Sequence, residues 1–262
     1  MDSLTLKLVL TPALIAAASL VGRRWGPGIS GWLVGLPLTS APIVFFLALG
    51  HGPRFASIAA TGTMAGTISQ AAFCLTYARL ASGGVALSVG AAALVFAACT
   101  LVLDHVRASL SVLFVLAVGS LVIALSWMPR SLPAESPGRA VPRWDLGARM
   151  VLATMFVVLL TGLAPTLGPR LAGLLAPFPI YATVLTIFAH LQAGPVAAAS
   201  VLRGLLLGLF GFASFFLVLA VLLERGGIVL AFTLATLVAF GLQAVSLLIL
   251  RRGDRERPIR QT

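Results

Sequence analysis

The fold is decided by the stretch Gly26-Pro27-Gly28-Ile29-Ser30-Gly31-Trp32-Leu33-Val34-Gly35-Leu36-Pro37, which recurs 142 positions later as Gly168-Pro169-Arg170-Leu171-Ala172-Gly173-Leu174-Leu175-Ala176-Pro177-Phe178-Pro179. Aligned without gaps, residues 26–66 and 168–208 share twelve identities in 41 positions. Eight of these identities are glycine or proline, which chance matching of leucine- and alanine-rich sequence does not readily supply. The recurrence predicts that the chain arose by duplication of one half.

The composition of the whole chain is that of a membrane protein. Sixty per cent of its 262 residues are hydrophobic, ten per cent are charged, and the mean hydropathy is +1.08, whereas soluble domains carry about a quarter charged residues. The apolar runs are continuous and reach the roughly 20 residues that a helix needs to cross a hydrocarbon core of about 30 Å. This pattern favours helices over the alternating strands of a barrel. We therefore expect an all-α, polytopic membrane protein with a single membrane domain over residues 1–262.

Nine transmembrane helices are expected. Residues 84–127 are divided into two spans because a single helix of that length would extend about 66 Å, twice the hydrocarbon core. The first span is read as structural and not as a cleaved signal, since Arg23 and Arg24 follow the apolar run. The spans lie at about 4–22, 29–50, 55–79, 85–103, 109–127, 147–164, 171–191, 197–223 and 227–250. They divide into repeat 1 (1–104), an extra helix (105–127), a proline-rich cytoplasmic linker (128–145), repeat 2 (146–250) and a basic cytoplasmic tail (251–262).

The basic residues assign the two sides of the membrane. Five Lys and Arg residues fall on the side of the N-terminus and thirteen on the opposite side. The positive-inside rule then places the N-terminus outside and the C-terminus in the cytoplasm. Arginine outnumbers lysine 17 to 1, and alanine and leucine are abundant, which fits a GC-rich bacterial genome and hence a bacterial inner membrane. The net charge of +11 is distributed over helix ends, which argues against a nucleic-acid partner and leaves membrane lipids as partners.

The odd number of spans before repeat 2 predicts how the two repeats are oriented. With five spans ahead of it, the first helix of repeat 2 crosses the membrane in the direction opposite to the first helix of repeat 1. The two four-helix repeats would then be related by a pseudo-twofold axis in the membrane plane. Inverted-topology repeats of this kind underlie many secondary transporters.

Two glycine pairs recur at aligned positions in the third helix of each repeat. Each pair places two small residues on one helical face, an arrangement that lets helices approach closely in lipid. The Gly-Pro pairs that precede them, at 52–53 and 194–195, predict a chain break between the second and third helices. The residues predicted to form this packing seam are Gly62, Gly66, Gly204 and Gly208.

Prolines inside the second helix of each repeat mark the candidate binding site. A proline removes a backbone donor and disrupts the helix, and unwound helix at membrane depth persists only where it is packed in protein or lines a cavity. One interpretation is a pair of broken helices that bind substrate at the repeat interface; the other is a kink that serves packing alone. The predicted helix-break residues are Pro37, Pro42, Pro177 and Pro179, and the predicted substrate-binding residues beside them are Thr39, Ser40, Tyr181 and Thr183.

Arg203 is the outstanding ionisable residue within an apolar span. It lies eight positions beyond Pro195, roughly 12 Å along the helix, and its aligned partner is the neutral Thr61. It is therefore a candidate substrate-binding residue for an anionic head group or a substrate carboxylate. The alternative is that its side chain extends back to the cytoplasmic interface.

Residues that would indicate catalysis or metal binding are missing from the expected membrane interior. Asp104 and Glu224 fall at helix ends, and no nucleophile with a nearby base can be assembled, so we expect neither an enzyme nor a cofactor. The three histidines are far apart, and no metal site is predicted. His190 fits either a proton carrier or a solvated helix end. Gln70 and Gln243 are polar groups in apolar spans that fit either interhelical hydrogen bonds or ligand binding.

The segment from Leu171 to Ala182, followed by Ala189-His190, resembles a known family. Its Ala-Gly-Leu, Pro-Phe-Pro and Ala-His elements are similar to those of the GlpM-like family of small bacterial inner-membrane proteins, which carry such a pattern in one short four-helix unit. The resemblance covers about 40 residues of the second half and reaches the first half only through the internal repeat. It implies residence in the inner membrane and no particular activity.

Together these patterns favour a transporter or flippase that moves a small anionic or zwitterionic solute, or a lipid, by alternating access. The alternative is a non-transporting accessory or assembly factor for envelope biogenesis, with helices packed tightly along all glycine faces. A selective channel is a third class, against which the lack of charged rings argues. A homo-oligomer is compatible with either of the first two.

Overall fold

The computed structural model describes residues 26–129 and 145–255, together with the isolated residues 9, 12 and 13. The expected first span, most of the linker and the end of the basic tail lie outside the described residues. Every element of the described chain is helical: α2 (Gly26–Val34), α3 (Ser40–His51), α4 (Pro53–Leu80), the 3-10 turn η1 (Ala81–Gly83), α5 (Val85–His105), α6 (Leu110–Trp127), α7 (Asp145–Leu175) and α8 (Ile180–Arg255).

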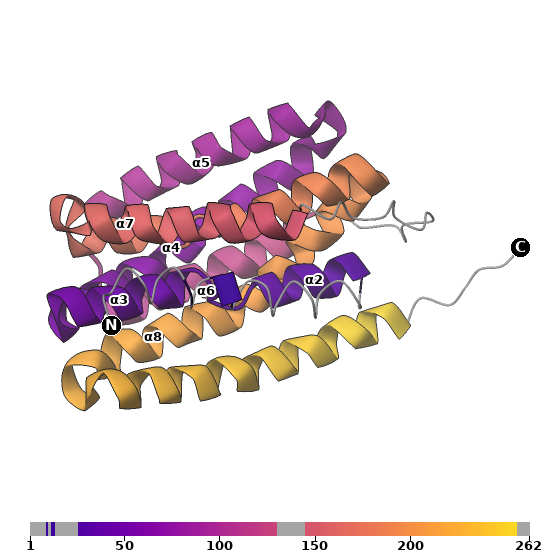
Figure 1. Ribbon diagram of the computed structural model, residues 1–262. Coiled ribbons are helices and arrows are strands. Elements are labelled where there is room, and N and C mark those ends of the chain that lie inside the picture. Colours follow the sequence, from indigo (N-terminus) through magenta and orange to yellow (C-terminus); the bar gives the residue numbers. More distant parts are fainter. Residues whose placement is uncertain (1–8, 10–11, 14–25, 130–144, 256–262) are drawn as a thin grey trace, which may run out of the picture.

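Several of these helices are long and apolar enough to cross a membrane, as the composition predicts. Five segments of the described chain meet that criterion, and Ser40–His51 is a shorter apolar helix. The longest segment, Ile180–Val245, has 66 residues, which as one straight helix would extend about 99 Å. Non-helical backbone at Gly194 and Gly227 divides it, and Gly168 likewise interrupts α7. Figure 1 shows α8 reversing direction, so that its last segment runs back beside the preceding one.

Helix α4 and the middle of α8 form the centre of the bundle. Helix α4 contacts α3, α5, α6, α7 and α8, and its buried residues are mostly alanine, glycine, serine and threonine, which allow close packing. The outer elements expose apolar side chains, among them Leu94 on α5 (73% exposed), Val115 on α6 (67%) and Val229 on α8 (81%). Figure 1 places α5 and the last segment of α8 at opposite edges of the bundle. Exposed aliphatic surface of this extent is what lipid tails would cover.

Glycines hold the two halves of the chain in contact. A Cβ at Gly31 would lie 2.8 Å from the carbonyl carbon of Val201, and a Cβ at Gly173 would lie 2.8 Å from the carbonyl carbon of Ala59. Gly173 is 142 residues beyond Gly31, and Val201 is 142 residues beyond Ala59. The contact is therefore made twice, with the roles of the two halves exchanged.

A second pair of contacts also joins aligned positions with the two halves exchanged. A Cβ at Gly35 would lie 2.5 Å from Gly208 Cα, and a Cβ at Gly66 would lie 2.5 Å from Pro177 Cγ. Pro177 and Gly208 are 142 residues beyond Gly35 and Gly66. Of the other predicted seam residues, Gly62 approaches the backbone oxygen of Arg170 at 2.6 Å from its Cβ position, and Gly204 is buried.

Gly52 and Gly194 occupy a backbone conformation that alanine resists. Their φ/ψ values are 88°/167° and 79°/−176°, and each stands directly before the proline that opens the next helix. We expect Gly52→Ala and Gly194→Ala to destabilise the protein by about 1 to 2 kcal/mol each, since this region is open essentially only to glycine. The free energy of unfolding in mild detergent measures the effect. Gly50→Ala is the matched control, because a Cβ at Gly50 meets open space, and a loss as large as that of Gly52→Ala would contradict the conformational argument.

Candidate functional site

Both predicted helix breaks are present as unwound segments. Residues 35–39 separate α2 from α3, and residues 176–179 separate α7 from α8. Pro37 lies in the first segment, and Pro177 and Pro179 lie in the second. Each of these prolines lacks a backbone N–H and disfavours helical backbone in the residue before it, which accounts for the interruption. Pro42, in contrast, lies within the first turn of α3, a position that proline tolerates.

The helices that flank the first unwound segment are bonded to the second unwound segment and to the last segment of α8. The Ser40 hydroxyl donates to the carbonyl oxygen of Ala176 at 2.8 Å. The Gln243 side-chain nitrogen donates to the carbonyl oxygen of Trp32, near the end of α2, at 2.9 Å. Residues separated by more than 130 positions in the sequence therefore meet at one place.

A small cavity of about 20 Å³ lies between the unwound segments. A space of this size holds about one water molecule. Its polar side chains come from Thr39, Ser40, Gln70 and Tyr181. The complete lining consists of Val34, Leu36, Leu38, Thr39, Ser40, Gln70, Pro177, Phe178, Pro179, Ile180, Tyr181, Ala182 and Phe212.

Most of the lining residues occur in pairs that are 142 positions apart. The pairs are Leu36 and Phe178, Leu38 and Ile180, Thr39 and Tyr181, Ser40 and Ala182, and Gln70 and Phe212. Aligned residues of the two halves thus face one space. Within each pair the side chains differ, and in two pairs, Gln70 with Phe212 and Ser40 with Ala182, one residue is polar and the other apolar.

Gln70 also lines the cavity, and the sequence left open whether it makes interhelical hydrogen bonds or binds a ligand. It projects from α4, is 5% exposed, and its side-chain oxygen has no hydrogen-bond partner in the described chain. The sequence signal is an amide within an apolar span, aligned with Phe212 in the other half. Buried amides are nearly always paired, so an unpaired one at a cavity indicates a place for a ligand or water.

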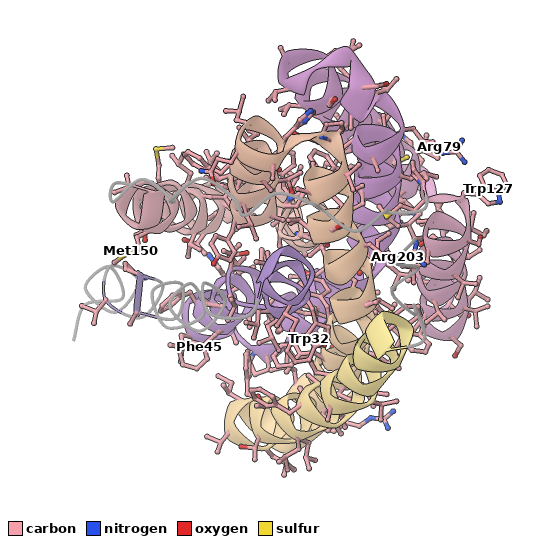
Figure 2. All side chains as sticks on the ribbon, turned by 90° about the vertical axis from the view of Figure 1, so that its right-hand side faces the viewer. Trp32, Phe45, Arg79, Trp127, Met150 and Arg203 are labelled. Atoms are coloured by element: carbon pink, nitrogen blue, oxygen red, sulfur yellow. The ribbon has the colours of Figure 1, made fainter. Side chains whose placement is uncertain are left out.

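Of the five predicted substrate-binding residues, three line the cavity and two do not. Thr39, Ser40 and Tyr181 are lining residues. The Thr183 hydroxyl instead donates to the carbonyl oxygen of Pro179 at 2.7 Å. Arg203 is half-buried on the middle segment of α8 and is absent from the lining. In Figure 2 it lies between that segment and α6, and we find no hydrogen bond or ion pair of Arg203 with any described residue.

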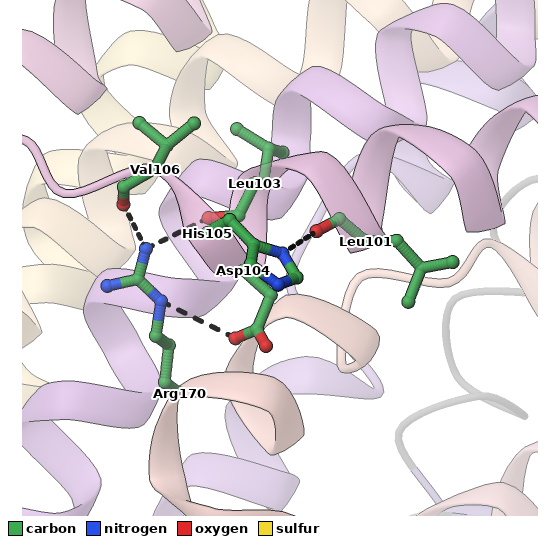
Figure 3. Close-up of polar contacts among 6 residues, drawn as sticks. All are labelled: Leu101, Leu103, Asp104, His105, Val106 and Arg170. Atoms are coloured by element: carbon green, nitrogen blue, oxygen red, sulfur yellow. Dashed lines mark hydrogen bonds and ion pairs between the residues drawn. The ribbon is translucent and has the colours of Figure 1, made fainter.

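Two other arginines hold the ends of neighbouring helices. The Arg170 guanidinium donates to the carbonyl oxygens of Leu103, at 2.9 Å, and Val106, and its Nε lies 3.5 Å from a carboxylate oxygen of Asp104 (Figure 3). The Arg79 guanidinium donates twice to the carbonyl oxygen of Trp127, at 2.9 and 2.6 Å. A positive charge at a helix C-terminus satisfies free carbonyls and the helix dipole. These arginines therefore fix the ends of α5 and α6.

His190 contacts Tyr77 rather than the cavity. Its Nδ1 lies 3.2 Å from the Tyr77 hydroxyl, a contact that joins α8 to α4. Among residues 26–129 and 145–255, no three His, Cys, Asp or Glu side chains are grouped so as to hold a metal ion. Cys74 is buried and Cys99 is half-buried, and neither is in a disulfide.

Comparisons with protein-family models, with curated proteins and with solved structures find no match to this chain. The resemblance to the GlpM-like family therefore stays a prediction from the sequence.

Proposed function

We propose that this chain is a membrane transporter or flippase that binds a small solute in the cavity between its two broken helices. The observation that carries the proposal is the cavity itself, which both unwound segments line with residues from aligned positions. Non-helical backbone within a membrane is costly unless it is packed or serves a cavity. Broken helices that meet at the repeat interface are a recurrent site for substrate in secondary transporters.

The proposed architecture is nine transmembrane helices in two inverted four-helix repeats, with 105–127 as the extra helix. The exchanged contacts of Gly31 with Val201 and of Gly173 with Ala59 support a twofold relation between the repeats, and the inverted orientation rests on the odd number of spans before repeat 2. A twofold axis generates contacts of this isologous kind, in which each partner takes both roles. We further propose the bacterial inner membrane as the location, with the N-terminus outside and the C-terminus in the cytoplasm, on the bias of the basic residues.

Transport would proceed by alternating access. One repeat would rock against the other around the cavity, so that the solute is reached first from one side and then from the other. A cavity of about 20 Å³ would correspond to a state closed toward both sides. Arg203 lies five residues, about 7.5 Å along the helix, from Gly208, which contacts Gly35 at the break. We assign it to the path between the cytoplasm and the cavity, where its charge would attract an anionic solute.

Cysteine labelling tests this proposal without knowledge of the solute. In a background with Cys74→Ala and Cys99→Ala, Thr39→Cys and Tyr181→Cys are each treated in sealed vesicles with a membrane-impermeant maleimide from either side. Alternating access predicts that both positions react, and from both sides. Ile43→Cys is the control, because Ile43 is fully buried on α3 and does not line the cavity. If Thr39→Cys and Tyr181→Cys remain as unreactive as Ile43→Cys, the chain is a tightly packed accessory factor and the proposal is wrong.

A further inference from the structure

Four helix ends meet at the cavity, and most carbonyls at the two C-terminal ends accept a hydrogen bond. At the end of α2, the oxygen of Trp32 accepts from Gly35 N–H and from Gln243, and the oxygen of Leu33 accepts from Leu36 N–H. At the end of α7, the oxygen of Leu175 accepts from Phe178 N–H, and the oxygen of Ala176 accepts from the Ser40 hydroxyl. Each of these ends therefore retains one carbonyl without a donor in the described chain, that of Val34 in α2 and that of Leu174 in α7.

The two N-terminal ends, in contrast, retain free donors. We find no acceptor within the described chain for the backbone N–H groups of Thr39, Ser40 and Ala182, all three of which line the cavity. Thr39 makes no side-chain cap for α3 either. Ser40 and Ala182 occupy aligned positions, so each half presents a free N–H at the start of its helix. Such groups, together with the helix dipole, form an anion-binding site.

Gln70 supplies an independent indication of a ligand. It comes from a different helix, α4, is 95% buried, and its side-chain oxygen has no hydrogen-bond partner in the described chain although Gln70 lines the cavity. The unpartnered atom is an acceptor in the present orientation; a half-turn of the amide about its last bond exchanges oxygen and nitrogen and presents an N–H donor to an anion. None of the thirteen lining residues is charged, so no side chain neutralises a bound ion.

We propose that the cavity binds a small, singly charged anion between the N-terminal ends of α3 and α8, with Gln70 as a further donor. This inference rests on the proposed function and names its solute class. Each helix N-terminus carries about half a positive charge, so the two together balance about one negative charge. A doubly charged anion would remain uncompensated in a buried site, at a large energetic cost. The volume of about 20 Å³ holds about one water molecule, so a single halide ion is the closest fit, and nitrate or a carboxylate group requires the cavity to widen.

Ligand-dependent stability tests the inference. The full-length protein is reconstituted in nanodiscs of phosphatidylcholine, which carries no net charge, and its unfolding midpoint is measured against chloride, nitrate, formate and sulfate at constant ionic strength with gluconate. A ligand that binds only the folded state raises the midpoint in a saturable manner. We expect saturation with one or more of the three small monovalent anions, and no response to sulfate or to exchange of sodium for potassium.

Two variants locate the effect. Gln70→Leu should raise the apparent Kd for the anion about tenfold or more, the loss expected for one hydrogen bond to a charged group. Thr67→Val is the matched control: it removes a buried, unpartnered hydroxyl one helical turn away that does not line the cavity, and it should leave the Kd unchanged. If Gln70→Leu does not fold, Gln70→Met retains the side-chain length and provides the same comparison.

The outcomes separate this inference from the proposed function. Saturable binding of a cation or of sulfate, no saturable response to any small anion, or an unchanged Kd in Gln70→Leu would each overturn the anion assignment. If Thr39→Cys and Tyr181→Cys are nevertheless labelled from both sides, the cavity is a solute site of another chemistry and the proposed function stands. If neither anion binding nor labelling occurs, both are wrong.

Discussion

Gly31→Ala and Gly173→Ala are each expected to destabilise the protein by about 3 kcal/mol or more and to abolish the monodisperse folded species. At either position the added methyl group would lie 2.8 Å from a backbone carbonyl carbon of the other half, and closer still to the carbonyl oxygen. Overpacking in a core costs about 1 to 3 kcal/mol when side chains can yield. Here the obstacle is backbone, so a helix has to move and the cost is larger.

The measurement is the fraction of folded protein after solubilisation, with the unfolding midpoint of whatever survives. Gly90→Ala on α5 is the control, because a Cβ there meets open space and alanine favours a helix over glycine by about 1 kcal/mol. Because the two contacts are related by the exchange of halves, Gly31→Ala and Gly173→Ala should have similar effects. If one is tolerated and the other is not, the two halves do not pack equivalently.

The helix breaks could be predicted from the sequence because their causes are local. Pro37, Pro177 and Pro179 remove backbone donors in their own segments, so the interruption needs no information about neighbours. The same holds for Gly52 and Gly194, each of which stands before a proline. Three of the five predicted substrate-binding residues line the cavity for this reason: they are neighbours of the prolines that unwind the chain.

The sequence could not predict which faces of the helices contact one another. In the sequence, Gln70 is an amide within an apolar span like many others. Its unpartnered side-chain oxygen indicates a ligand site only because the fold places α4 at the cavity between the two breaks. Thr183 was expected at the site, but its hydroxyl is used by the Pro179 carbonyl one turn earlier, a local bond that competes with ligand binding. Arg203 has the charge of a ligand-binding residue, yet its position along α8 keeps it from the lining.

Arg170→Met is expected to cost about 3 kcal/mol of stability, from hydrogen bonds between a charged donor and backbone carbonyls. The guanidinium spans the end of α5 and the following residues, where the Val106 oxygen has no other donor in the described chain. The ion pair with Asp104 adds little, because both side chains are about a third exposed, at 29% and 35%. Arg170→Lys should restore only part of the loss, since an ammonium cannot match the planar fork of the guanidinium.

Arg79→Met provides the comparison that isolates burial. Arg79 also donates to a carbonyl at a helix end, that of Trp127, but it does so at an exposed site, where we expect a loss below about 1 kcal/mol. Unfolding of the two variants in the same detergent measures the difference, and equal losses would show that the half-buried site confers no added strength.

Position 28, which aligns with Arg170, is glycine, so only one of the two halves carries this anchor. The two sides of the cavity would then be held closed with unequal strength. We therefore expect Arg170→Met, introduced together with Thr39→Cys, to increase maleimide labelling of the introduced cysteine from the side of the membrane on which α5 ends.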